Sequence, residues 1–159
     1  MTENHGNNAS DACFVRQASL EDESAIARFL TEAYGERAQF KYPARWKWQF
    51  RDNPFLSEFP GLPIWIAVRN DRVVGQTCAQ IEPLRVGDRE TLVGWSVDTV
   101  VLPEFRGLGL GKQLQKANQD SHPVFMSLSM SSANRGIKES LGGSRLPDVD
   151  VMDLSLIHI

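Results

Sequence analysis

The segment Asp98–Lys112 (DTVVLPEFRGLGLGK) constrains the fold more than any other part of the chain. A Val-rich run, Thr91–Leu102, ends at Pro103, and three glycines follow within the six residues Arg106–Gly111. Because glycine has no β-carbon, backbone N–H groups can converge there on one oxygen-rich group. The helix that we expect to begin at Gly109 adds free N–H donors and a partial positive charge at its N-terminus. This strand–turn–helix unit predicts a phosphate site, and a pyrophosphate site in particular.

Two other phosphate-binding motifs compete with this interpretation. A dinucleotide-binding fingerprint requires the spacing Gly-x-Gly-x-x-Gly, whereas these glycines follow the spacing Gly-x-Gly-x-Gly in mid-chain. A P-loop requires Gly-Lys-Ser/Thr, but Gly111 and Lys112 are followed by Gln113. A glycine-rich connection without any ligand is the purely structural alternative.

Composition narrows the class of protein. The chain has 159 residues, of which 42% are hydrophobic and 23% are charged, as in a single soluble domain. Its formal net charge of -3 disfavours nucleic acid as a partner. No apolar run approaches the ~20 residues that a membrane span requires, so we expect a cytoplasmic protein without a membrane partner. The two cysteines, Cys13 and Cys78, are too few for a zinc cluster, and we expect no metal.

Hydrophobic periodicity and turn residues predict the remaining elements. The expected strands are Ala12–Ala18, Ile64–Val68, Arg72–Ile81, Thr91–Leu102, Val124–Ser131 and Val149–Leu154. The expected helices are one capped by Ser19 and closed by Gly35, then Lys41–Phe50, Gly109–Ser121 and Ala133–Leu141, with a loop over Phe55–Gly61. Helices that interrupt a mostly antiparallel run of strands indicate an α+β fold, with a mixed, mostly antiparallel central sheet flanked by helices.

The segment Leu102–Gly111 (LPEFRGLGLG) resembles the pyrophosphate-binding motif of the GNAT superfamily, the acyl-CoA-dependent N-acetyltransferases. That motif is Gln/Arg-x-x-Gly-x-Gly/Ala after a strand, and Arg106, Gly109 and Gly111 occupy its fixed positions. The expected order of elements over Cys13–Val151 is similar to that of the family. The resemblance implies transfer of the acetyl group from acetyl-CoA to a primary amine, by direct attack in a ternary complex.

The resemblance also implies which residues bind acetyl-CoA. Backbone N–H groups would hold the pyrophosphate, supplied by Arg106, Gly107, Leu108, Gly109, Leu110, Gly111 and Lys112. Thr99, Val100 and Val101 would pair with the pantetheine arm like an added strand, and an N–H there would stabilise the oxyanion. The strand Val124–Ser131 would diverge to open the acyl slot. Asn134 matches an Asn that contacts pantetheine in the family, with a helix-capping role as the alternative.

Two carboxylates are candidates for the base that takes the proton of the attacking amine. Asp98 lies eight residues before Arg106, where many family members carry an acidic residue. Simple alternation along the strand places Asp98 and Val100 on one face. A purely structural carboxylate is the alternative for Asp98. Glu82 on the preceding strand is a weaker candidate, acting through water.

The acid that would protonate the leaving thiolate is unassigned. The family often uses a Tyr in the last helix, but Leu141 falls at that position here, and the only tyrosines are Tyr34 and Tyr42. Either the thiolate leaves without an acid or a nearby serine serves. The candidate serines are Ser131, Ser132 and Ser140.

The segment Lys41–Asn53 (KYPARWKWQFRDN) is the candidate border of the acceptor site, as the second helical segment is in the family. Four of its side chains could form an aromatic and basic rim for a small-molecule or peptide amine, namely Tyr42, Trp46, Trp48 and Arg51. The alternative is that they close the core. Two tryptophans two residues apart do not share one helical face. Its basic residues also resemble a small nucleic-acid patch, which the acidic composition disfavours.

The chain ends are expected to lie outside the domain. We predict a disordered leader over residues 1–11, one N-acetyltransferase domain over residues 12–154, and a tail over residues 155–159. Leu154–Ile159 (LSLIHI) resembles the translation of a sequencing adapter, which predicts a truncated chain whose sheet lacks its last strand. The alternative is that these residues complete the sheet. Together with the missing Tyr, this truncation supports an alternative function, a non-catalytic acyl-CoA-binding module.

Overall fold

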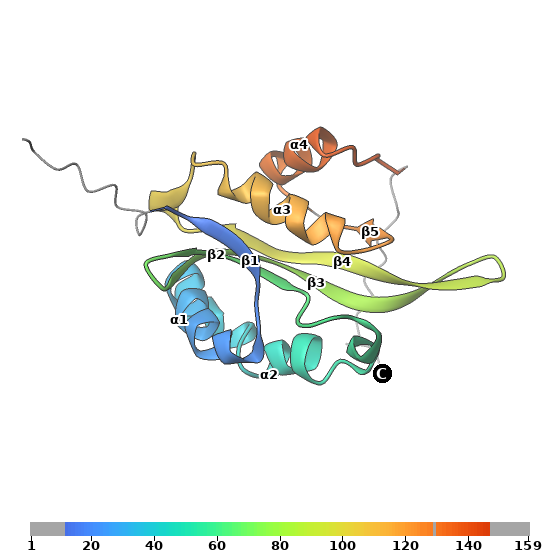
Figure 1. Ribbon diagram of the computed structural model, residues 1–159, viewed down its shortest axis with the longest axis horizontal. Coiled ribbons are helices and arrows are strands. Elements are labelled where there is room, and N and C mark those ends of the chain that lie inside the picture. The colour runs from blue at the N-terminus through green and yellow to red at the C-terminus, as the bar shows by residue number, and fades with distance from the viewer. Residues whose placement is uncertain (1–11, 129, 147–159) are drawn as a thin grey trace, which may run out of the picture.

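A five-stranded sheet forms the centre of the computed structural model, which describes residues 12–128 and 130–146 (Figure 1). The strands are β1 (Phe14–Gln17), β2 (Ile64–Arg69), β3 (Arg72–Val86), β4 (Arg89–Val101) and β5 (Phe125–Met126), in that spatial order. The first four pair antiparallel, and β5 runs parallel to β4. This confirms the predicted α+β class and the mostly antiparallel sheet.

Helices cover both faces of the sheet. On one face lie α1 (Glu23–Tyr34) and the short α2 (Ala44–Trp46), and on the other lie α3 (Leu110–Asp120) and α4 (Ser132–Ser140) (Figure 1). A short π-helix, Lys47–Arg51, continues α2. Short 3-10 helices span Leu20–Asp22, Gly35–Phe40, Pro54–Glu58 and Pro103–Phe105. The expected helix over Lys41–Phe50 is therefore split into α2 and a π-helix. None of the described helices is both long and apolar enough to cross a membrane.

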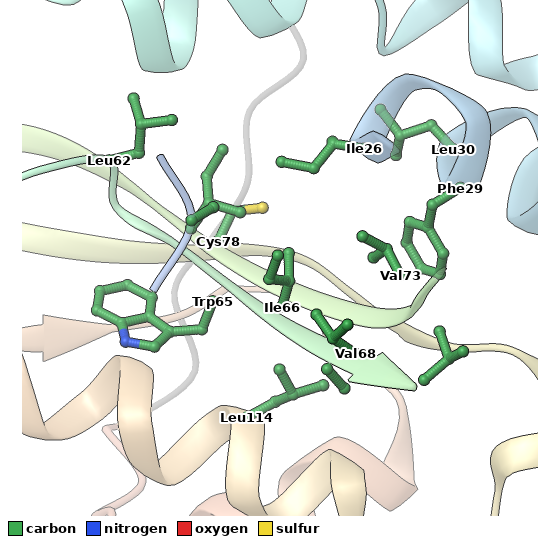
Figure 2. Packing of buried hydrophobic residues seen from close by; sticks show 14 of the residues in the cluster. Ile26, Phe29, Leu30, Leu62, Trp65, Ile66, Val68, Val73, Cys78 and Leu114 are labelled. Atoms are coloured by element: carbon green, nitrogen blue, oxygen red, sulfur yellow. The ribbon is translucent and has the colours of Figure 1, made fainter. Parts of the chain in front are cut away.

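The core explains why these segments fold together. Ile26, Phe29 and Leu30 recur on one face of α1 and are at most 2% exposed. They pack toward β2 and β3, while Leu114 of α3 approaches from the other face of the sheet (Figure 2). Because both faces of β2 are covered, its sequence IWIAV is an unbroken apolar run. Cys78 belongs to this core, and burial raises the pKa of its thiol well above the usual value.

The strands β3, β4 and β5 differ from their predicted bounds. β3 and β4 extend to a turn at Gly87, where φ is 61°, and form a ribbon that projects beyond the other strands (Figure 1). β5 is only two residues long instead of spanning Val124–Ser131, because it pairs with β4 at Gly94 and Trp95 alone. The predicted strand Val149–Leu154 and both chain ends lie outside the described residues.

An aromatic stack holds the start of β5 against α3. The His122 ring lies between Phe59 and Phe125, with centroids 5.1 and 5.7 Å away, and meets the Trp65 edge at 5.7 Å. Its Nε2 is 3.1 Å from Asn118 Oδ1. Since the Asn118 amide donates to the Cys78 carbonyl, its oxygen is the acceptor for a proton on Nε2. The ring covers Gly94, where an added Cβ would lie 2.7 Å from it.

Gly94→Ala should therefore destabilise the fold by about 1–3 kcal/mol, the usual cost of overpacking a rigid site. The control is Gly136→Ala in α4, where an added Cβ meets nothing within 4 Å. That change should stabilise the chain by about 0.5–1 kcal/mol, because alanine favours helix. Urea unfolding measures both free energies. Equal effects of the two substitutions would show that the stack is loose at Gly94.

His122 should also make stability depend on pH. Burial lowers its pKa to about 4, so between about pH 6.5 and pH 4 the unfolded chain binds a proton that the native ring does not. Native stability is therefore lost as pH falls through this window. In His122→Phe this contribution is absent, so Tm should fall less from pH 7 to pH 5 than it does in the parent chain. Parallel Tm curves for the two proteins would contradict the assignment.

Candidate active site

The loop before α3 has the backbone conformation that its glycines predict. Gly107 and Gly109 have φ of 83° and 76°, in the left-handed region that side chains with a Cβ rarely adopt. Gly109 is the residue immediately before the first turn of α3. An added Cβ there would lie 4.0 Å from Gln113 Nε2 and no closer to anything else. The space over the turn is therefore open.

Several backbone N–H groups of this loop are free to bind a ligand. The Arg106 N–H donates to the Pro103 carbonyl at 3.2 Å, and the Lys112 N–H donates to the Gly109 carbonyl at 3.1 Å. Within the described residues, the N–H groups from Gly107 to Gly111 donate to no protein acceptor. At the two ends of the expected donor set, the Arg106 and Lys112 N–H groups are therefore already used by the backbone itself.

The Arg106 side chain is held at the end of β4. Its Nε donates to the Val101 carbonyl at 3.1 Å, so the guanidinium lies against the end of β4. This contact joins the last residue of the strand to the loop and holds the loop at that end. An anion at the N-terminus of α3 would lie next to these free N–H groups and the positive end of the helix dipole.

A β-bulge in β4 places Asp98. Cys78 and Gln76 of β3 pair with Val97 and Val100, so β4 carries one extra residue at this point. Asp98 lies at the bulge and has a positive φ of 50°. Simple alternation along the strand does not predict this step. The bulge directs the carboxylate to the side of the sheet that α1 and α2 cover.

Two cations hold the Asp98 carboxylate on that side. Lys41 Nζ pairs with Oδ1, and Arg45 Nη2 lies 3.6 Å from Oδ2. The Asp98 and Lys41 side chains are only 13% and 17% exposed. Lys41 Nζ also lies 4.5 Å from the centroid of the Tyr34 ring. Lys41 and Arg45, considered above as part of a basic patch, are therefore turned inward to the carboxylate.

A chain of side-chain hydrogen bonds joins the two candidate bases. Arg45 Nε donates to Gln49 Oε1 at 3.0 Å, and Gln49 Nε2 donates to Gln80 Oε1 at 2.6 Å. Gln80 Nε2 in turn donates to Glu82. Asp98 and Glu82 are thus two ends of one network. Sequence analysis missed its middle, although Gln80 and Glu82, two residues apart on β3, were a signal of a polar stretch on one face.

The predicted acceptor rim is brought together only in part. Trp46 is 2% exposed and packs edge-on between Tyr42 and Phe50, with centroids 6.2 Å away, so it lies in the core and not on a rim. Trp48 is 62% exposed, which confirms that the two tryptophans face opposite ways. The Tyr42 hydroxyl donates to Glu23 at 3.0 Å, and Arg51 forms an ion pair with the same carboxylate.

The strands β4 and β5 diverge beside the bulge. Their last pair is Trp95 with Met126, and beyond it the residues up to Val101 pair with β3 alone within the described part of the chain. One edge of β4 is therefore open over Thr99, Val100 and Val101. An extended chain that carries amides can add to such an edge through backbone hydrogen bonds.

The serines near α4 are used for the helix itself. The Ser131 hydroxyl caps the helix by accepting from the Asn134 N–H at 3.3 Å, and Ser140 Oγ donates to the Ile137 carbonyl at 2.7 Å. Ser131 is thus the cap, which leaves the Asn134 side chain without that role. Two of the three serines considered as acids are committed to backbone contacts.

The donor set suits an acyl-CoA. The open glycine turn with its free N–H groups fits a pyrophosphate, and the open edge of β4 that leads to it fits a pantetheine chain with two amides. Among residues 12–128 and 130–146, no group of three or more His, Cys, Asp or Glu side chains is arranged to hold a metal ion.

Comparisons with known proteins agree with this geometry. The model of the acetyltransferase (GNAT) family matches residues 24–120. No curated protein matches the chain in sequence. Solved structures with a similar fold include glucosamine-6-phosphate N-acetyltransferase from Arabidopsis thaliana, with a TM-score of 0.60 and 15% identity over 91% of this chain and 100% of that one.

Two further structures were solved with ligands. A predicted acetyltransferase from Clostridium acetobutylicum, solved with acetyl-CoA, has a TM-score of 0.65 and 13% identity over 93% of this chain and 100% of that one. The aminoglycoside N-acetyltransferase AAC(6')-Iy, in complex with the bisubstrate analogue CoA-S-monomethyl-acetylneamine, has a TM-score of 0.64 and 18% identity over 91% of this chain and 99% of that one. These likenesses concern the fold, whereas the family match covers more than half of the chain. The chain therefore belongs to the acetyltransferase (GNAT) family and is an enzyme of the acyltransferase class.

Proposed function

We propose that this protein transfers the acetyl group of acetyl-CoA to a primary amine by direct attack within a ternary complex. The observation that carries the proposal is the continuity of the free N–H groups of Gly107 to Gly111 with the open edge of β4 and the bulge at Asp98. Fold neighbours solved with acetyl-CoA and with a CoA bisubstrate analogue support this choice of donor.

The donor would bind along one continuous track. The N-terminus of α3 offers its dipole and free N–H groups to the pyrophosphate. Thr99, Val100 and Val101 offer backbone groups to the pantetheine arm, and Asn134 lies on the first turn of α4 with its side chain available to the same arm. When bound, acetyl-CoA supplies an activated acetyl thioester, and an N–H at the bulge is placed to stabilise the negative charge that develops on its oxygen.

The acceptor would enter from the side of the sheet that α1 and α2 cover. Neighbours named for glucosamine-6-phosphate and for aminoglycosides support a small-molecule amine as the acceptor class, and a peptide amine is the other predicted class. Of the predicted rim, Trp48 offers an exposed ring. The proposal involves no metal, nucleic acid or membrane, and the cytoplasm stays the predicted location.

Asp98 is the proposed base, and Lys41 and Arg45 position it. An amine attacks only when neutral, so its proton must move to a nearby group before or during attack. The bulge brings the Asp98 carboxylate to the acceptor side, and its two cations fix the direction in which it points. Glu82, at the other end of the same network, is the weaker alternative.

A binding module without turnover is the second candidate function. It is favoured by the pairing of Asp98 with two cations and by the absence of tyrosine from Ser132–Ser140. Release of free CoA thiol in the presence of a panel of amines separates the two functions. Donor binding without any release would support the module.

Gly109→Val should abolish acetyl-CoA binding, because the added side chain would occupy the open turn. The matched control is Gly87→Val in the β3–β4 turn, where φ is also positive and an added Cβ also meets nothing within 4 Å. At a hundred times its Kd, a ligand adds about 2.7 kcal/mol of stability. Thermal melts with acetyl-CoA should show this rise in the parent chain and in Gly87→Val only. An equal rise in Gly109→Val would overturn the site.

Asp98→Asn should lower the rate of acetyl transfer by about 10²–10⁴-fold and leave acetyl-CoA affinity unchanged. Asparagine tolerates the positive φ of this position and keeps an oxygen that can accept from Lys41, so the substitution removes the charge of the carboxylate with little change to the backbone of the bulge. Asp120→Asn, which removes an exposed carboxylate paired with Lys116, is the control for charge. If Asp98→Asn acetylates at the parent rate across the pH range, Asp98 is structural and Glu82→Gln becomes the next variant to assay.

A further inference from the structure

Lys138 of α4 is a half-buried cation without a counter-ion in the described part of the chain. Its Nζ donates to Gln115 Oε1 at 3.0 Å and lies 4.3 Å from the centroid of the Phe125 ring. Within the described residues, its ammonium contacts one amide oxygen and one aromatic face. A long amphipathic side chain usually extends its charged end into water, so this inward placement calls for an explanation.

The two contacts place the ammonium where β4 and β5 separate. Phe125 forms one of the two pairs that join β5 to β4. Gln115 Nε2 donates at 2.7 Å to Thr99 Oγ1, on the residue after the bulge. Thr99 Oγ1 also lies 2.7 Å from Thr77 Oγ1, so these groups form a hydrogen-bonded network within the sheet–α3 layer. Lys138 thus spans the divergence from the α3 side, opposite the side to which Asp98 is directed.

The surroundings suit a group that exchanges a proton near neutral pH. Burial lowers the pKa of Lys138 to about 8. The neighbours from the other elements are the uncharged Gln115 and Thr99, the Phe125 ring, and His122 stacked on that ring, which burial keeps neutral at pH 7. On α4 itself, Glu139 and Arg135 are exposed. The lysine is therefore protonated at pH 7 and can give up its proton at little cost.

We propose that Lys138 is the acid of the reaction, donating the proton that the CoA sulfur gains as its bond to the acetyl carbon breaks. The proposal rests on the function proposed above. The amine nitrogen forms a bond to the acetyl carbon and loses one proton to the base, while the electron pair of the broken C–S bond stays on sulfur. The Nζ proton then completes the thiol, and solvent restores the ammonium before the next turnover.

Three variants separate this role from packing and from simple charge. Lys138→Met keeps the length of the side chain and its contact with Phe125 but removes the proton. Lys138→Arg keeps the charge but does not deprotonate at working pH. Lys116→Met on the exposed face of α3 is the matched control, since its side chain is 62% exposed and, within the described part of the chain, pairs with Asp120. Thermal melts identify any variant that fails to fold.

The first measurement is the pH profile of kcat with saturating acetyl-CoA. In the parent chain kcat should fall as pH rises through about 8, because the acid loses its proton there. Lys138→Met should lower kcat about 10²-fold at pH 7 and remove this alkaline limb. The kcat of Lys138→Arg should stay at least about tenfold below that of the parent chain. The kcat of Lys116→Met should equal the parent value.

The second measurement is binding without turnover, by calorimetry with CoA and with acetyl-CoA. An ammonium next to sulfur favours the thiolate of CoA but has no such effect on the thioester. Lys138→Met should therefore weaken the binding of CoA by about tenfold more than the binding of acetyl-CoA. This ratio is the equivalent of one pKa unit on the thiol. Lys138→Arg should keep the parent ratio, since its charge remains.

The outcomes distinguish this inference from the function on which it rests. A parent chain that does not bind acetyl-CoA overturns the proposed function itself. A parent chain that acetylates amines, together with a Lys138→Met variant of equal rate and unchanged pH profile, overturns the role of Lys138 alone. Full activity in Lys138→Arg would show that charge without proton transfer is sufficient, and would also overturn it.

Discussion

The extra residue in β4 determines how the two halves of the site are separated. Between Val97 and Val100 the strand carries one residue more than β3 does, and Asp98 absorbs the mismatch with a positive φ. An acidic side chain is thereby directed to the α1–α2 side, while Thr99 faces Gln115 on the α3 side. A strand that alternated regularly from Val97 onward would place both of these side chains on the opposite faces. Both networks of the site depend on this single step in register.

The ion pairs around Asp98 explain how such a backbone persists. A non-glycine residue with positive φ is strained by about 1–3 kcal/mol and remains only where its surroundings determine its position. Lys41 and Arg45 come from the segment just before and within α2, whose helical stretches are short. Their contacts with Asp98 therefore tie that segment to the sheet as well as stabilising the bulge. Because a buried charge is costly when unpaired, none of the three side chains can be removed without affecting the other two.

The sequence predicted those parts of the structure that a few adjacent residues determine. The glycines of the loop and the helix behind them could be predicted because positive φ and a helix N-terminus are properties of a few adjacent residues. The bulge could not, since it depends on the register of β4 against Thr77 of β3, and the residues Val97–Val101 contain no glycine or proline to mark it. In the same way, the spacing of Trp46 and Trp48 predicted opposite faces, but only tertiary packing decides which ring is buried.

The short length of β5 is also decided by tertiary pairing, and it shapes the candidate site. Its sequence would allow a longer strand, yet it pairs with β4 only at Gly94 and Trp95, before the bulge changes the course of β4. The divergence that follows exposes one edge of β4 between an acidic group on one side of the sheet and an ammonium on the other. Direct attack on a thioester needs a proton acceptor on the side of the amine and a proton donor on the side of the sulfur. The proposed base, Asp98, and the proposed acid, Lys138, lie on opposite sides of this strand edge, so the bulge that opens the edge also keeps these two groups apart.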